Sequence, residues 1–63
     1  MRFIKLKEVM DCTGLGRSTI YKYIENEQFP KQISLGDRAV AWLEGEVHDW
    51  MMAKLEGRKS VTD

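Results

Sequence analysis

The side chains best suited to chemistry lie on one short helix, which residues 17–26 are expected to form. Ile20 and Ile24 are four residues apart, so they share one face of that helix. Cations and hydroxyl groups are donors to phosphates and to the edges of nucleic-acid bases. The opposite face carries two cations, two hydroxyl groups and one carboxylate, in Arg17, Ser18, Tyr21, Lys22 and Glu25.

A tight turn precedes this helix and sets its position. Leu6, Val9 and Met10 follow helical spacing and predict a first helix from about residue 7. Gly14 is expected to end it, because glycine readily takes a left-handed conformation, and Gly16 is the expected N-cap of the second helix. Two helices joined in this way, with a basic second helix, form the helix–turn–helix shape that fits a DNA major groove.

A hairpin is expected after the second helix. Residues 32–35 and 39–42 are rich in apolar side chains, and the glycine and aspartate between them are typical of a hairpin turn. We refer to residues 32–42 as the wing. Arg38, near its tip, is expected to reach a flanking phosphate or a narrow minor groove. Lys31, just before the wing, is a further candidate phosphate contact.

The remaining apolar residues predict a closing helix and a thin core. The helix is expected from about Glu44 to Glu56, and residues 58–63 form a polar C-terminal tail. Phe29, Trp42 and Trp50 are expected to pack inside. The fold class is therefore mostly α with a small β-hairpin, a winged helix–turn–helix domain over residues 1–57.

Composition limits the function classes. The chain has 63 residues and a net charge of zero, which argues against nucleic acid as a partner. Its charges are unevenly placed, however. Residues 1–24 carry five cations and two carboxylates, whereas residues 39–63 carry three cations and five carboxylates. With no apolar run near the ~20 residues that span a bilayer, the sequence predicts a cytoplasmic protein without membrane contact.

Residues of catalytic or metal-binding type are few. One cysteine cannot form an internal disulfide, and Cys12 with His48 alone cannot build a zinc site. Cys12 is expected to be a small packing residue. Tyr21 is expected to have no core role and to contact a sugar or a phosphate instead. No nucleophile–base pair or carboxylate pair stands out, so the sequence predicts no enzyme, no metal and no cofactor.

Four motifs in order give the chain a family resemblance. They are L-K-E-V-x-x-x-T-G-L-x-R-S-T-I-Y-x-x-I from Leu6, then F-P-K, then L-G-x-R-A-V-x-W, and E-V-x-x-W in the closing helix. The chain resembles the AlpA family of small phage and prophage regulators, over about residues 3–55. The resemblance implies a MerR-like or excisionase-like DNA-binding domain whose recognition helix includes Thr19. Gly16 and Ala41 depart from it, where serine and a basic residue are common, and imply weaker non-specific affinity.

The predicted function is sequence-specific binding of double-stranded DNA by a phage or prophage transcriptional regulator. Two alternatives stay open: an excisionase that bends DNA and recruits an integrase, and an antirepressor that binds another protein through the acidic closing helix. A domain this small gains little affinity alone, so self-association or cooperative binding, and contact with an integrase or RNA polymerase, are also considered. The predicted DNA-binding residues are Arg17, Ser18, Thr19, Tyr21, Lys22, Lys31 and Arg38.

Overall fold

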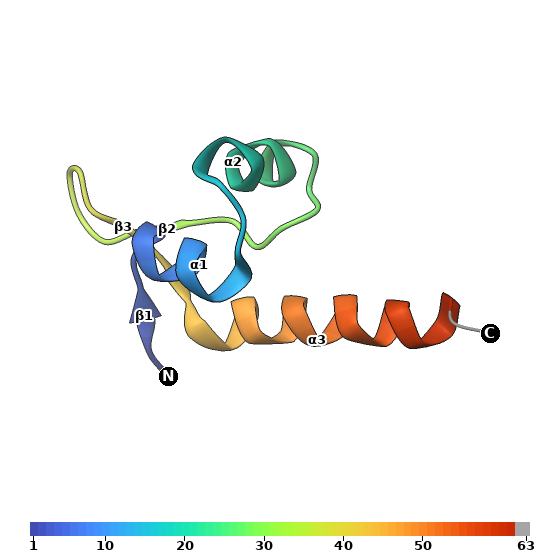
Figure 1. The fold of residues 1–63 in the computed structure, drawn as a ribbon. Helices are drawn as coiled ribbons and strands as arrows, with labels where there is room; N and C mark the ends of the chain where they lie inside the picture. The colour runs from blue at the N-terminus through green and yellow to red at the C-terminus, as the bar shows by residue number, and fades with distance from the viewer. Residues whose placement is uncertain (62–63) are drawn as a thin grey trace.

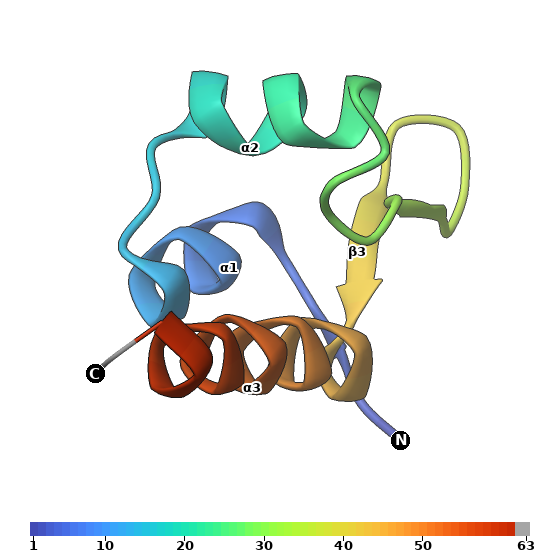
Figure 2. The same ribbon diagram turned by 90° about the vertical axis from the view of Figure 1, so that its right-hand side faces the viewer.

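The structure is a computed structural model that describes residues 1–61, with side chains to Arg58. It is mostly helical, with three helices and a small antiparallel sheet, and α2 and α3 lie on opposite sides of α1 (Figure 1, Figure 2). The elements in chain order are β1 (Phe3–Ile4), α1 (Leu6–Thr13), α2 (Arg17–Glu25), β2 (Ile33–Ser34), β3 (Val40–Leu43) and α3 (Glu44–Val61).

The first two helices agree with the sequence analysis. Val9 is fully buried in α1, and Leu6 and Met10 pack beside it at the edge of the core. Ile20 is fully buried in α2, and Ile24 packs against the same core. The apolar spacing in each helix therefore places one face inward and leaves the other to solvent.

The closing helix is longer than predicted. α3 begins at Glu44, as expected, but continues to Val61, so the prediction that it ends near Glu56 and is followed by a polar tail is wrong over residues 57–61. A glycine inside a helix costs only about 1 kcal/mol. It ends a helix when its backbone turns left-handed, and Gly14 is the only described glycine with a positive φ. Residues 62–63 of the predicted tail lie outside the described part of the chain.

The sheet has three strands, with β3 in the centre. The predicted hairpin pairing is confirmed, because β2 and β3 are antiparallel with Ile33 opposite Ala41. The N-terminal strand, for which the sequence predicts only an extended conformation, pairs with the other edge of β3, with Ile4 opposite Trp42. Ala41 is fully buried, so position 41 lies in the core and not on the wing surface. The weaker non-specific affinity that the departures at positions 16 and 41 imply stays a prediction.

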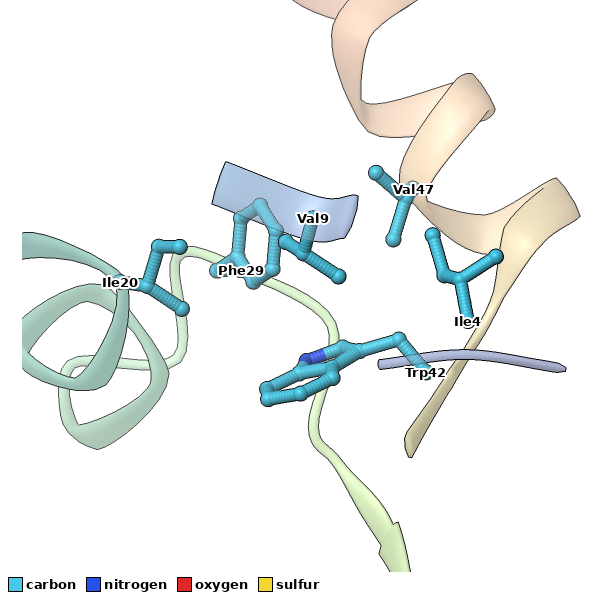
Figure 3. Close-up of a cluster of buried hydrophobic side chains, with 6 residues drawn as sticks. All are labelled: Ile4, Val9, Ile20, Phe29, Trp42 and Val47. Carbon is cyan, nitrogen blue, oxygen red and sulfur yellow. The ribbon is translucent and has the colours of Figure 1, made fainter. Parts of the chain in front are cut away.

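Each element except β2 contributes to one core. Six buried side chains converge there, Ile4, Val9, Ile20, Phe29, Trp42 and Val47 (Figure 3). The predicted burial of Phe29 and Trp42 is confirmed. Trp50 is only half-buried; its ring centroid lies 4.8 Å from that of Phe29, and its indole N–H donates to the Gln28 carbonyl at 2.7 Å.

Arg2 ties the N-terminal strand to two helices. Its guanidinium lies 2.9 Å from a carboxylate oxygen of Glu8 in α1 and 2.6 Å from one of Glu44 in α3. These carboxylates raise the pKa of Arg2, Glu8 most strongly. The ion pairs are solvent-exposed, so each contributes little to stability. The Glu44 N–H also donates to the Arg2 carbonyl at 2.8 Å, which joins the start of the chain to the start of α3.

Candidate nucleic-acid interface

The turn between α1 and α2 is fixed by local hydrogen bonds. Gly14 has φ 75° and ψ 7°, in the left-handed region, and its N–H donates to the Met10 carbonyl at 2.8 Å. Thr13 has no predicted role, yet its hydroxyl donates to the Val9 carbonyl at 2.7 Å and accepts from the Leu15 N–H at 3.2 Å. The predicted role of Gly14 is confirmed, and these hydrogen bonds fix the turn that leads into α2.

The outward face of α2 is polar and open. Arg17, Ser18 and Lys22 are exposed, whereas Thr19 is half-buried beside Ile20. Gly16 is the N-cap, as predicted, and as a glycine it has no side chain that could accept a hydrogen bond from the first turn. The N-terminal N–H groups of α2 therefore lack a side-chain acceptor from the cap, next to the exposed Arg17 and Ser18.

Tyr21 is partly buried against the core and is not a fully exposed residue of the outward face. The prediction that it has no core role is wrong, because its ring packs edge-on against buried Trp42, with centroids 6.4 Å apart. The ring is half-buried, and the Arg17 guanidinium carbon lies 6.0 Å from its centroid. Tyr21 therefore connects the core to a cation of the outward face, through an approach at the outer limit of a cation–π interaction.

Trp42 also fixes the segment that carries Lys31. Its indole N–H donates to the Pro30 carbonyl at 3.0 Å. Because Trp42 lies in the central strand, this bond joins the loop after α2 to the sheet. Lys31 follows directly and is exposed.

Arg38 lies in the loop between β2 and β3 and is exposed. The loop is closed by a hydrogen bond from the Leu35 N–H to the Ala39 carbonyl at 2.7 Å and by one from the Ser34 hydroxyl to the Gly36 carbonyl at 3.1 Å. In Figure 1 this loop projects from one side of the molecule. The predicted position of Arg38 near the tip is therefore confirmed.

The ion pairs lie elsewhere on the molecule. Besides the two pairs of Arg2, Lys7 lies 3.6 Å from Asp11 along α1. Within the described side chains, none of the four candidate cations forms an ion pair with a carboxylate. These cations, which remain available to an external anion, are Arg17, Lys22, Lys31 and Arg38.

Other chemistry is limited. In the described residues no group of three or more histidine, cysteine or acidic side chains is arranged to hold a metal ion. Cys12 is exposed, so its expected packing role is wrong. Its sulfur donates to the Val9 carbonyl at 3.5 Å, and partial burial raises the pKa of the thiol. None of the helices within residues 1–61 is long and apolar enough to cross a membrane.

Comparison with known proteins identifies relatives. A family model described as Prophage CP4-57 regulatory protein (AlpA) matches residues 2–55. The chain is 52% identical to an uncharacterized protein, ORF88, of Enterobacteria phage P4, over 98% of this chain and 70% of that protein. It is 33% identical to the DNA-binding transcriptional activator AlpA of Escherichia coli K12, over 81% of each. The chain therefore belongs to the AlpA family of prophage regulatory proteins.

Proposed function

We propose that this protein binds double-stranded DNA through α2 and regulates phage or prophage genes. The observation that carries the proposal is the outward face of α2, where Arg17, Ser18 and Lys22 are exposed and the two cations have no carboxylate partner among the described side chains. An α-helix of this kind fits the major groove of B-DNA. The similarity to a relative named as a DNA-binding transcriptional activator supports the same function.

Two roles are assigned to residues of α2. Arg17, in the first turn, donates to guanine O6 and N7 or to a phosphate, and Ser18 donates to the backbone beside it. Lys22 lies at the last turn and binds a phosphate or a second base. Tyr21, packed on Trp42, sets the position of this face relative to the sheet and steadies Arg17.

The wing extends the interface along the duplex. Arg38 at the loop and Lys31 before β2 are exposed cations carried by a segment that Trp42 ties to the core. They bind phosphates beside the major-groove site, or Arg38 enters a narrow minor groove. The zero net charge of the whole chain does not oppose this, because a duplex responds to charges within about 10 Å.

DNase footprinting on the DNA upstream of the protein's own gene, at several salt concentrations, tests the proposal. We expect a defined footprint that weakens steeply with salt and is lost in Arg17→Ala. Lys54→Ala removes a cation from α3, on the other side of α1, and should leave the footprint unchanged. Several phased footprints with bent DNA would favour the excisionase alternative. No protection at low salt would contradict DNA binding and favour the antirepressor alternative.

A further inference from the structure

The second half of α3 is open to solvent over the side chains that the structure describes. Beyond Met51, every described side chain of α3 is exposed, over residues 52–58. Figure 1 shows these turns projecting past α1 and past the rest of the molecule. Met52 and Leu55 are large apolar side chains with 44% and 41% of their surface exposed. Apolar side chains grouped on a projecting helix are typical of a surface that another helix covers.

The spacing along α3 identifies the face that would be covered. Glu44, His48, Met51, Leu55 and Arg58 are separated by four, three, four and three residues. Residues at this spacing share one face of a helix, and the two apolar ones, Met51 and Leu55, lie near the middle of that face. We name these five residues the α3 stripe, and Met52 flanks its centre. The stripe is acidic at its first residue, apolar at its centre and basic at its last.

The stripe is complementary to itself when two copies run antiparallel. Met51 is the midpoint, with Glu44 seven residues before it and Arg58 seven residues after it. A two-fold axis at Met51 therefore places Glu44 of each copy beside Arg58 of the other. It also brings Leu55 of each copy opposite Val47 of the other. A parallel pair would instead place like charges together, which is unfavourable.

A pocket lies where the partner's Leu55 would arrive. Its volume is about 310 Å³, and it lies between α1 and the first half of α3. Ile4, Val47 and Met51 supply apolar lining, so a leucine side chain suits it. The other residues that line it are Glu8, Cys12, Glu44, Gly45 and His48.

The charge at this pocket favours the basic end of a second α3. Arg2 forms ion pairs with both Glu8 and Glu44, so these three side chains together carry a net charge of minus one. The rim therefore keeps a negative charge, and Arg58 of the other copy would bring a positive one. The complementary ends select the antiparallel arrangement, while the apolar centre supplies most of the affinity.

We propose that two copies of this chain associate through an antiparallel pair of α3 helices, with Leu55 of each copy entering the pocket of the other. The α3 helix has 18 residues and is about 27 Å long, so the interface is small by the standard of permanent dimers. Association is therefore reversible and depends on concentration. It requires no DNA, and its test is independent of the proposed DNA-binding function.

Sedimentation equilibrium of the full chain without DNA, over a series of protein concentrations, gives the first test. We expect the average mass to rise from one copy to two. Glu44→Arg and Arg58→Glu should each weaken association at least tenfold, since each places like charges together at both ends of the pair. An equimolar mixture of the two variants should restore it, because both charge pairs are then opposite. This rescue separates a broken interface from a folding defect at Glu44.

Cysteine cross-linking gives a second test that leaves the charges intact. In a Cys12→Ser background, Met52→Cys lies beside the two-fold axis and should form a disulfide-linked dimer under mild oxidation. Ala53→Cys, the next residue, is also exposed but faces away from the stripe, and should cross-link far more slowly. A single-copy mass at every concentration, no rescue in the mixture, or equal cross-linking at positions 52 and 53 would overturn the proposal.

Discussion

Replacing Gly14 with alanine should destabilise the protein through its backbone alone. Gly14 has φ 75°, and an alanine Cβ built there would meet no atom within 4 Å. The left-handed conformation costs an alanine roughly 1–2 kcal/mol. Replacing glycine with alanine also lowers the conformational entropy of the unfolded chain, which by itself stabilises the folded state by about 0.4–1 kcal/mol. We therefore expect a net loss of about 1 kcal/mol in the free energy of unfolding.

Gly16 supplies the matched control in the same turn. Its φ of −78° and ψ of 163° suit any residue, and an added Cβ again meets nothing within 4 Å. In Gly16→Ala the gain from a stiffer unfolded chain is offset by the poorer N-cap, so stability should change by less than about 0.5 kcal/mol. Gly16→Ser supplies a better cap and should raise stability.

Thermal and urea denaturation, followed by far-ultraviolet circular dichroism, would measure these effects. A domain of this size shifts its Tm by about 4–8 °C for each kcal/mol. Gly14→Ala should therefore melt several degrees below the wild type, and Gly14→Asn should lose less, because asparagine tolerates the left-handed region. If Gly14→Ala were as stable as Gly16→Ala, the left-handed turn would not be the constraint between α1 and α2.

Three further predictions concern single side chains. Trp42→Phe removes the donor to the Pro30 carbonyl and leaves a void, which should lower the free energy of unfolding by about 2–3 kcal/mol in urea denaturation. Thr13→Val removes the acceptor of the Leu15 N–H and should cost about 1 kcal/mol in the same assay. The raised pKa of Cys12 means that the folded thiol holds its proton more tightly than the unfolded one. The free energy of unfolding should therefore fall as pH rises through the folded thiol's pKa, and Cys12→Ser should lack this fall. The rate of iodoacetamide alkylation should reach its midpoint at a higher pH in the folded protein than in an unfolded thiol.

Local patterns in the sequence are sufficient to predict α1, α2 and the turn between them. Ile20 and Ile24 define the inner face of α2 by their spacing, and Gly14 marks the end of α1 by its conformational freedom. The hairpin follows from its turn residues. Each of these depends on residues within a few positions of one another, which is the range over which periodicity and capping are informative.

Pairings between distant segments cannot be read in this way. The pairing of Ile4 with Trp42 joins residues far apart in the chain, and no local signal specifies it. Tyr21 is expected on the surface because its helix face is polar, yet the neighbouring Trp42 ring partly covers it. Helical spacing gives the direction of a side chain, but not what lies beside it.

The end of α3 differs from its prediction for another reason. Gly57 favours a helix end, but it does not take the left-handed conformation in which a glycine commonly ends a helix, and no proline follows it in residues 58–61. The role of Thr13 cannot be predicted from local sequence, because its two hydrogen bonds depend on the geometry of the turn to which it belongs. Its position one residue before the glycine is the available signal.

The central claim, that the outward face of α2 contacts DNA, is tested most directly by the salt dependence of binding to a duplex that carries the footprinted site. Arg17→Gln with Lys22→Gln should weaken binding and reduce the slope of log K against log salt by about 0.9 for each phosphate that the variant no longer neutralises. Lys7→Gln with Lys54→Gln removes the same charge from α1 and α3 and should leave the slope unchanged. Equal slopes for the two double variants would contradict the claim.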